Sequence, residues 1–344
     1  MFPSSSSRLA NSVTTAPQPA KRTGLLGWFR NLPIGRKQLI ALFTCELVPI
    51  LGFGIGSTFV LQNSLRTQLL EQAKSEVSVT ETNYNIKINQ MGFGSRGQSD
   101  NVAVFTAARE FQRNENLPSN LQNQLKTILQ NEVNARKMEY ATLVSKDLRI
   151  IGNANANRAK EKIQAPNLVE LIQQSIKEGH QIKASEIVSW DELTKENPPL
   201  PEGFSQQDGL IRYVITPVRD PDRRDEILGV LIFGDLVDRK LPIVENTLTA
   251  FGGGYSAVYA KSPSGEFKLA TSLDKADSRS PQFGATLSNS AILESAAAAK
   301  GETVTSRTQV GGQTYTIEST DRNSGSNDSG DQRSPRCNFG ARHA

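Results

Sequence analysis

The feature that most constrains this chain is an apolar run near its N-terminus. From Leu39 to Leu61 there are 23 residues with a single charge, Glu46. A helix of that length spans roughly 35 Å at about 1.5 Å per residue, enough to cross a hydrocarbon core about 30 Å thick. No polar stripe at helical spacing runs through the segment, as a buried helix of a soluble domain would show. Residues 38–62 are therefore predicted to form a transmembrane helix.

Glu46 does not prevent this helix from inserting. Thirteen Leu, Ile, Phe and Val residues of the run favour insertion by about 0.3 to 0.6 kcal/mol each, or about 4 to 8 kcal/mol together. An acid at the centre of the bilayer costs on the order of 3 kcal/mol, and Glu46 lies off-centre. It is either a partner for another helix in an oligomer or a tolerated residue near the headgroups, and the second interpretation is favoured.

The orientation of the span follows from the charges that flank it. Residues 1–37 hold six basic residues and no acid, whereas the segment after residue 62 mixes both signs. The positive-inside rule then places the N-terminus in the cytoplasm and the rest of the chain outside the cell's inner (plasma) membrane. A cleaved secretory signal fits worse, because no small-residue cleavage site follows Gln62.

Composition excludes several classes of function. The chain has 39 basic and 35 acidic residues, and without the six basic residues of 1–37 the balance is 33 against 35. No polyanion-binding surface is indicated, so nucleic acid is not an expected partner. With only His180 and His343, a zinc site or a Ser-His-Asp triad is not expected, and neither is a cofactor. The paired acids Asp191 and Glu192 lie in a polar loop pattern typical of solvated rather than catalytic groups.

The first part of the chain is expected to be a disordered basic tail over 1–37, the span 38–62 and a helical stalk over 63–137. Apolar residues recur at intervals of three and four over 63–91, which predicts an amphipathic helix. That helix is either simply the first helix of a domain or also a pairing surface for a second copy, which makes a homodimer the expected assembly. A second helical stretch covers 101–137 and is broken near 116–120.

A pattern of elements then occurs twice. The first copy has predicted strands at 140–146, 148–152, 184–190, 210–218 and 226–235, with a helix at 167–178. The second copy has predicted strands at 255–261, 266–271, 302–309 and 312–319, with a helix at 289–299. The shared order of hairpin, helix and further strands predicts an α+β fold with two antiparallel-sheet lobes, 138–250 and 251–320.

The second copy stops one strand short of the first. Residues 321–344 are nearly devoid of apolar residues and show no periodicity, so they are expected to be disordered. The chain is interpreted as truncated or shifted out of frame near residue 320, which leaves the second lobe incomplete. A natural disordered end is the alternative.

Several long strings carry a resemblance to a known family. They are NLPIGRKQLIALF, the ELV within the span, SLRTQL, TNYNIKINQMGFGSRGQSDN, YATLVSKDLRIIGNANANR, PPLPEGF, LPIVENT and AFGGGYSAVY. Together they resemble the N-terminal part of methyl-accepting chemotaxis proteins of cyanobacterial type and related sensory receptors, over roughly residues 30–319. The resemblance implies two PAS-like lobes that form a double Cache domain. Such receptors continue to a second membrane helix, a HAMP linker and a signalling module, and this sequence shows none of them.

The resemblance implies that the first, membrane-distal lobe captures a small molecule. A pocket of this kind needs an aromatic wall and a few convergent polar groups. Trp190 and Tyr213 are candidates for the wall, Asp235 for accepting a ligand ammonium group and Arg158 for clamping a carboxylate. Asn153 and Asn155 are candidate amide donors and acceptors; the list of candidates matches the family only by residue type and rough order. Alternatively, these are core residues and turn-stabilising side chains.

The function implied is that of an extracytoplasmic sensing region of a transmembrane chemoreceptor. Ligand binding would shift the lobe between two geometries and pass the change to the membrane helix. The same sensor type also precedes membrane histidine kinases and nucleotide cyclases, which is the alternative. A fragment without a signalling role is a third interpretation, and catalysis by this chain is not expected.

Overall fold

The computed structural model describes residues 29, 32–223, 225–262, 264–275, 282–284, 287, 289–299, 304–310, 313–321 and 336–343. It divides into two compact units, Met1–Leu65 and Arg66–Ala344. Most of the expected disordered tail, 1–37, lies outside the described residues, and a helix begins at Ile34.

Helix α2 (Ile34–Ser99) contains the predicted span 38–62 and is the one described helix long and apolar enough to cross a membrane. Large apolar side chains in the span are exposed, for example Phe53 at 81% and Ile55 at 71%. Exposed apolar side chains of this kind suit a helix that faces lipid. The predicted helix at 63–91 is confirmed, and it continues to Ser99.

Within the second unit, α2 buries a single stripe of side chains. The buried stripe includes Ala73, Val77, Thr80, Tyr84, Ile88 and Met91. Intervals of three and four residues place all of them on one face of the helix. This face of α2 therefore belongs to the core of the second unit.

Two shorter helices follow α2, as predicted. Helix α3 (Val102–Asn114) begins after Asn101, whose side chain accepts a hydrogen bond from Ala103 N at 3.0 Å and so caps the helix. Helix α4 (Ser119–Arg136) buries Leu121, Leu125, Leu129 and Val133 along one face. The break expected near 116–120 separates the two helices.

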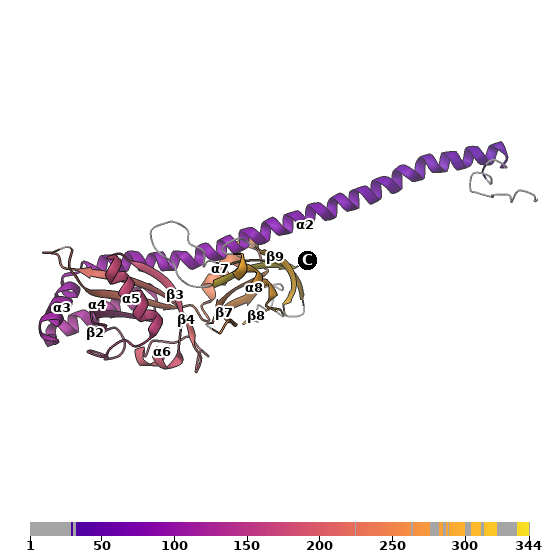
Figure 1. Ribbon diagram of the computed structural model, residues 1–344. Helices are drawn as coiled ribbons and strands as arrows, with labels where there is room; N and C mark the ends of the chain where they lie inside the picture. Colours follow the sequence, from indigo (N-terminus) through magenta and orange to yellow (C-terminus); the bar gives the residue numbers. More distant parts are fainter. Residues whose placement is uncertain are drawn as a thin grey trace, which may run out of the picture. The chain divides into compact units, whose positions relative to one another are not determined.

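Lobe one is built on a five-stranded antiparallel sheet (Figure 1). Its strands are β1 (Tyr140–Ser145), β2 (Ile150–Asn153), β3 (Ile182–Val188), β4 (Gly209–Arg219) and β5 (Ile227–Leu236). Their order across the sheet is β2-β1-β5-β4-β3. All five predicted strands are confirmed, and their ends differ from the predicted ones by at most two residues.

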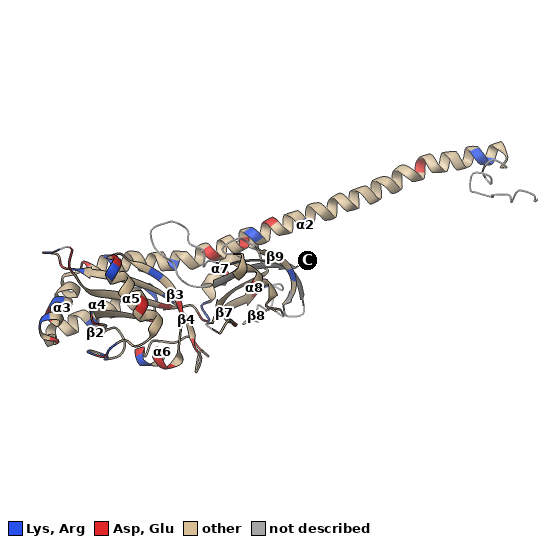
Figure 2. Cartoon of the chain, in the orientation of Figure 1, with Lys and Arg blue, Asp and Glu red and all other residues tan. Residues whose placement is uncertain are grey.

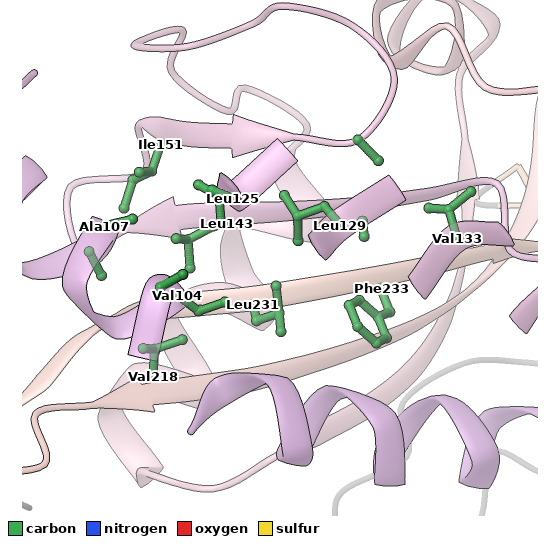
Figure 3. Packing of buried hydrophobic residues seen from close by; sticks show 14 of the residues in the cluster. Val104, Ala107, Leu125, Leu129, Val133, Leu143, Ile151, Val218, Leu231 and Phe233 are labelled. Carbon is green, nitrogen blue, oxygen red and sulfur yellow. The ribbon is translucent and has the colours of Figure 1, made fainter. Parts of the chain in front are cut away.

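One face of this sheet packs against α2, α3 and α4, and we call it the stalk face. Val214, Leu231 and Phe233 of the sheet share a buried cluster with Val104 of α3 and Leu129 of α4 (Figure 3). Because alternate residues of a strand point to opposite sides, the neighbours of these residues face the other way.

The opposite face carries the cavity described below, and we call it the cavity face. Tyr213, Ile215 and Ile232 lie there in a second buried cluster. Helix α5 (Pro166–Glu178) covers part of this face through Leu171 and Ile172. The helix predicted at 167–178 is therefore confirmed.

Lobe two repeats the topology of lobe one. Its strands are β6 (Tyr255–Lys261), β7 (Phe267–Asp274), β8 (Gln282–Phe283), β9 (Val304–Val310), β10 (Gln313–Asp321) and β11 (Arg336–His343), with helix α8 at Ala291–Ala298. The order β7-β6-β11-β10-β9 corresponds strand for strand to β2-β1-β5-β4-β3, and β8 is added at the β7 edge. The predicted internal repeat is therefore confirmed.

Strand β11 corrects the expectation of an incomplete lobe with a disordered end. The backbone of Arg336–His343 pairs antiparallel with both β6 and β10, in the place that β5 takes in lobe one. Composition predicted disorder here because the segment offers little apolar surface. Strand pairing uses backbone N–H and C=O groups, which this segment also has. Residues 322–335 and 344, the rest of that expectation, lie outside the described residues.

Two helices were not predicted. Helix α6 (Trp190–Glu196) begins where the sequence suggested a strand end and a polar loop. Helix α7 (Leu241–Phe251) carries the chain from lobe one to lobe two and ends at Gly252, which has a φ of 75°. Glycine adopts this left-handed conformation without steric cost.

Candidate functional site

A cavity of about 320 Å³ lies on the cavity face of lobe one. Its walls come from residues 164–168, from residues 186–188 of β3, and from Ser189, Glu192 and Tyr213. The start of α5, the end of β3, the start of α6 and the middle of β4 thus converge on one space. A volume of this size fits a small molecule.

Local sequence fixes where the two helices begin at the cavity. Pro166 is at the first position of α5, where its fixed φ and missing N–H are tolerated. Ser189 precedes α6, and its hydroxyl accepts a hydrogen bond from Glu192 N at 3.4 Å. The string SWDE has the spacing of a capping box, with Glu192 three residues after the capping serine. This turn holds the Glu192 carboxylate at the cavity wall.

Tyr213 provides the aromatic part of the wall and is held from behind by Tyr140. The two rings meet edge to face at 6.1 Å, and the Tyr140 hydroxyl donates a hydrogen bond to the Tyr213 hydroxyl. Gly234 makes room for the Tyr140 ring, since a Cβ there would lie 2.5 Å from a ring carbon. Both tyrosines are buried.

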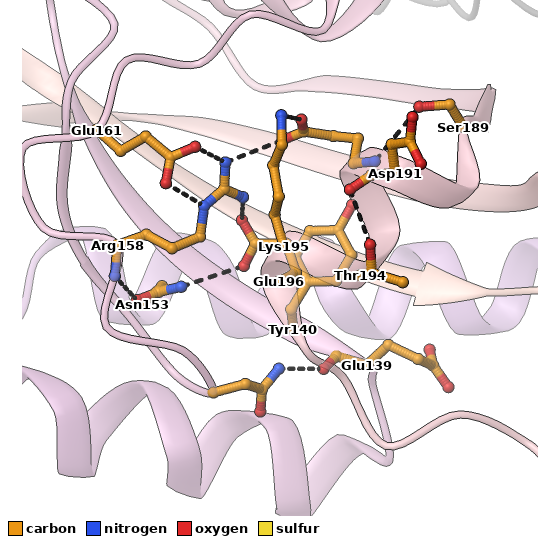
Figure 4. Close-up of polar contacts among 12 residues, drawn as sticks. Glu139, Tyr140, Asn153, Arg158, Glu161, Ser189, Asp191, Thr194, Lys195 and Glu196 are labelled. Carbon is orange, nitrogen blue, oxygen red and sulfur yellow. Dashed lines mark hydrogen bonds and ion pairs between the residues drawn. The ribbon is translucent and has the colours of Figure 1, made fainter.

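A charge cluster that is buried except for Glu161 adjoins the cavity, and we call Arg158, Glu161, Glu192 and Glu196 the cavity cluster (Figure 4). The Arg158 guanidinium donates to both Glu161 oxygens, at 2.9 and 2.6 Å, to Glu196 at 2.6 Å and to Glu192 at 3.1 Å. Its side chain is 5% exposed. Asn153 donates to Glu196 at 3.3 Å. Four of the five guanidinium N–H groups are thus used within the protein.

The ionisation of this cluster reflects burial and pairing. Burial alone would lower the pKa of Arg158, but its hydrogen bond to Glu161 and the charges of Glu196 and Glu192 raise it above its ordinary value. The hydrogen bond from Arg158 lowers the pKa of Glu161. Burial raises the pKa of Glu196, against the pull of Arg158. The cluster holds three carboxylates for one guanidinium.

A second buried charge cluster lies on the stalk face, and we call Lys87, Glu139, Arg212, Asp235 and Lys240 the stalk cluster. Arg212 Nε donates to Asp235 at 2.8 Å, and Arg212 Nη1 donates to the backbone oxygen of Tyr84 in α2 at 2.9 Å. Lys240 lies 2.5 Å from Asp235 and 2.8 Å from Glu139. Asp235 therefore joins α2, β4, β5 and the start of α7.

Burial and neighbouring charges shift the pKa values of the stalk cluster. Burial would raise the pKa of Asp235, but the charges of Arg212, Lys240 and Lys87 lower it. Burial raises the pKa of Glu139 to about 7. Burial also lowers the pKa of Lys87. Three nearby cations, Arg212, Lys240 and Lys87, therefore keep Asp235 ionised.

The structure brings only some of the predicted site residues together. Tyr213 lines the cavity, and Asn153 and Arg158 lie beside it in the buried network. Arg158 does not line the cavity, and its donors are engaged with glutamates. Asp235 lies on the other face of the sheet, already paired with cations, so its predicted role toward a ligand ammonium group is not matched by its position.

The two remaining candidates have structural contacts. Trp190 packs its ring against Phe204 at 6.2 Å, and its backbone N–H donates to Asp208 at 3.1 Å. Asn155 donates to the backbone oxygen of Glu139 at 2.7 Å. Sequence reasoning missed Glu186 as a wall residue and took Glu192 for a solvated acid. The S-x-x-E spacing at 189–192 was the available indication that a helix begins directly after Ser189 and that Glu192 belongs to its first turn.

Two other cavities are less suited to ligand capture. One of about 500 Å³ in lobe two is lined by the β6–β7 hairpin and the start of α8, and most of its polar wall residues, such as Glu266 and Glu294, are exposed. Another of about 160 Å³ lies where β3 of lobe one meets the end of β6. Among the described residues, no group of His, Cys, Asp and Glu is arranged to hold a metal ion.

No protein-family model matches the sequence, and no curated protein matches it. Several solved structures align with it. The periplasmic domain of Vibrio cholerae LuxQ is 12% identical, with a TM-score of 0.43, over 79% of this chain and 100% of that one. The ligand-binding domain of the Campylobacter jejuni chemoreceptor Tlp3 in complex with L-valine is 9% identical, with a TM-score of 0.47, over 82% of this chain and 95% of that one.

A third solved structure, methyl-accepting chemotaxis protein X, is 12% identical, with a TM-score of 0.46, over 82% of this chain and 100% of that one. All three TM-scores lie below 0.5. The architecture of this chain therefore rests on its own strand order, and its function on the geometry of the cavity.

Proposed function

We propose that this chain is the ligand-sensing region of a transmembrane chemoreceptor or related signal transducer. A small molecule binds in the lobe-one cavity and shifts the population of lobe geometries, and α2 carries the change toward the membrane span. We place this region outside the inner membrane, with the N-terminus in the cytoplasm, as the basic residues of 1–37 favour. The strings quoted above extend the proposal to a receptor of cyanobacterial type.

The observation that carries this proposal is the double role of strand β3. Glu186 and Val188 of β3 line the cavity. The side chains that point the other way contact α2: Ser185 Oγ lies 2.8 Å from the Tyr84 hydroxyl, and Lys183 donates to Asn89 at 2.7 Å. A ligand that displaces β3 by a fraction of an ångström therefore acts directly on α2.

The same strand also reaches lobe two. Asn167, Glu186 and Ile187 line both the main cavity and the smaller cavity of about 160 Å³, whose other wall is formed by Ala260, Lys261 and Ser262. Ligand contacts at β3 are thus shared with the end of β6. This arrangement supports a coordinated response of both lobes rather than a change confined to one.

We also propose that the chain binds its ligand without converting it. The Ser189 hydroxyl at the cavity is engaged with Glu192 N as a helix cap, and no histidine is among the described residues that line the cavity. We further propose a homodimer through 63–91, where Ile86 of α2 is 47% exposed. The output is chemotactic signalling in our proposal; an input role for a histidine kinase or a cyclase would use the same relay.

Thermal unfolding of the full chain in detergent with a metabolite library tests the proposal. At least one compound is expected to raise the melting temperature by an amount that grows with its concentration. Asn167→Trp, at the rim of the cavity, is expected to remove the shift by filling the entrance. Gln173→Trp, exposed on the same helix α5 and away from the cavity, is the matched control and should keep it.

The relay is tested separately with Tyr84→Phe, which removes only the hydroxyl that meets Ser185. This variant should bind the ligand with unchanged affinity but lose the ligand-induced change in hydrogen exchange along 66–99. A library without any hit, or a hit that survives Asn167→Trp, would place ligand binding elsewhere. An unaltered exchange response in Tyr84→Phe would mean that β3 does not transmit the change.

A further inference from the structure

The charged side chains that line the lobe-one cavity in the described part of the chain are all acidic. Among the described residues, the cavity wall includes two carboxylates, Glu186 and Glu192, and no Lys, Arg or His side chain. The remaining wall is apolar or neutral, with Leu168, Val188 and the ring of Tyr213. The cavity thus offers acceptors and hydrocarbon contact to a ligand but no cation.

The guanidinium beside the cavity does not correct this imbalance. Arg158 directs its donors to Glu161, Glu192 and Glu196, at distances from 2.6 to 3.1 Å, and its side chain is 5% exposed. Lys195 lies 3.0 Å from Glu192, but its side chain is 45% exposed and is not part of the wall. A ligand carboxylate would have to displace one of these glutamates to reach a cation.

The electrostatic environment of Tyr213 reports the same sign. Burial is the largest cause that raises the pKa of its hydroxyl, and the charges of Glu196, Glu192 and Glu186 raise it further, against the hydrogen bond from Tyr140. The three carboxylates therefore act together on one point of the cavity wall (Figure 2 marks the acidic positions of α6). The charges that shift the pKa of Tyr213 are thus all those of carboxylates.

The sign of a ligand's charge decides which ligands are admitted. Opposite charges attract and like charges repel, and both effects strengthen when the charges lie close together and away from bulk water. An ammonium group beside Glu192 is therefore attracted to it, and a carboxylate in the same place is repelled. A zwitterion gains with one group and loses with the other in a cavity of about 320 Å³, where its two charges lie close together.

We propose that the lobe-one cavity selects small organic ammonium ions that carry no carboxylate, with Glu192 and Glu186 accepting the ammonium group and Leu168, Val188 and Tyr213 enclosing the hydrocarbon part. This inference rests on the proposed function, because it assigns a ligand class to the same cavity. It differs from an amino-acid site, which needs a cation for the ligand carboxylate.

Matched sets of compounds test the class. One set is 3-methylbutylamine, leucine and 4-methylpentanoate, which share a hydrocarbon body; the other is 2-phenylethylamine, phenylalanine and 3-phenylpropanoate. Binding to the full chain in detergent is measured by calorimetry at pH 7. At least one amine is expected to bind at least tenfold more tightly than the amino acid and the acid of its set.

Substitutions locate the interaction. Glu192→Gln and Glu186→Gln are each expected to weaken amine binding at least tenfold, with the unliganded melting temperature recorded as a check of folding. Glu178→Gln is the control, because Glu178 lies at the far end of α5 and does not line the cavity. Unchanged amine affinity in both cavity variants would overturn the assignment of these carboxylates.

The outcomes also separate this inference from the proposed function. Tighter binding of an amino acid or an acid, lost in Asn167→Trp, would overturn the ammonium class and leave the sensing function standing. A hit from the metabolite library that is anionic or zwitterionic would do the same. A chain that binds nothing in either screen would lose both proposals.

Discussion

The two buried charge clusters of lobe one lie on opposite faces of the same sheet and differ in the sign of their surplus. The stalk cluster has three cations, Lys87, Arg212 and Lys240, for two carboxylates. The cavity cluster has three carboxylates for the single guanidinium of Arg158, and the exposed Lys195 also pairs with Glu192, which still leaves an acidic surplus. The strands β4 and β5 separate them, since Arg212 and Tyr213 are neighbours that point to opposite faces.

The difference matters because the surplus negative charge of the cavity cluster and the surplus positive charge of the stalk cluster depend differently on pH. Surplus carboxylates become neutral as the pH falls, whereas a guanidinium stays charged at any accessible pH. The Arg212–Asp235 pair of the stalk cluster therefore stays charged and joins α2 to the sheet, although Glu139 beside it titrates. The net charge of the cavity cluster can change with pH, and the cluster lies beside the cavity, where a charged ligand can also bind.

The largest effect is expected from Asp235→Asn. The substitution leaves Arg212, 2% exposed in its side chain, and two lysines with only Glu139 as a counter-charge. Breaking a buried ion pair by removing one partner costs about 3 to 5 kcal/mol. Urea unfolding of the full chain in detergent measures the loss.

Asp147→Asn is the control for this substitution, because Asp147 also pairs with an arginine, Arg149 at 3.0 Å, but is 59% exposed. Its cost should stay below about 1 kcal/mol, as for other surface pairs. Equal costs for both substitutions would show that Asp235 does not act as a buried joint.

A smaller effect, dependent on pH, is expected from Glu139→Gln. Burial raises the pKa of Glu139 from its ordinary value of 4.5 to about 7, so in this window the folded chain holds a proton that the unfolded chain has released. The stability that Glu139 contributes is complete below pH 4.5 and is lost as the pH rises through 7. Each pKa unit corresponds to about 1.4 kcal/mol.

The variant lacks this titration, so its stability relative to the wild type should rise by up to about 3 kcal/mol between the two pH values. Asp238, whose pKa burial also raises to about 7, is present in both proteins and cancels in the difference. Unfolding curves at closely spaced pH values provide the measurement. A pH-independent difference would mean that Lys240 keeps Glu139 ionised throughout.

Periodicity predicted most of the sheet because its strands carry their own evidence. Tyr140–Ser145 and Tyr255–Lys261 are buried strands rich in β-branched and aromatic residues, and each is followed by a turn. The repeat of hairpin, helix and strands then gave the two lobes. Strand β11 escaped because its place depends on β6 and β10, which lie far from it in the sequence.

The candidate site was harder to predict, because partners in a cluster are set by the third dimension. Residue type pointed to Arg158 and Asp235 as groups for a ligand, but the sheet turns one to a network of glutamates and the other to the stalk face. Strands β4 and β5 pair Arg212 with Asp235, so these two side chains lie on the same face of the sheet. Tyr213 is the next residue of β4, and its side chain therefore points to the opposite face. That register is not readable from one sequence.

The smallest of the three effects, and the one that most sharpens the comparison, is expected from Arg158→Met. It leaves Glu161, Glu192 and Glu196 facing one another, at a cost of about 2 kcal/mol at pH 7, less than for a fully buried pair because Glu161 is 41% exposed. Mutual repulsion raises the carboxylate pKa values in the variant, so its deficit should shrink by at least half between pH 7 and about pH 4.5, as protons relieve the repulsion. The Asp235→Asn deficit should not shrink over the same range, because Arg212 cannot discharge and Glu139 becomes protonated rather than taking the place of Asp235. Arg158→Lys keeps a cation and should recover part of the lost stability at pH 7. If the stability deficits of Arg158→Met, Arg158→Lys and Asp235→Asn ran parallel at every pH, packing rather than charge would distinguish the two faces.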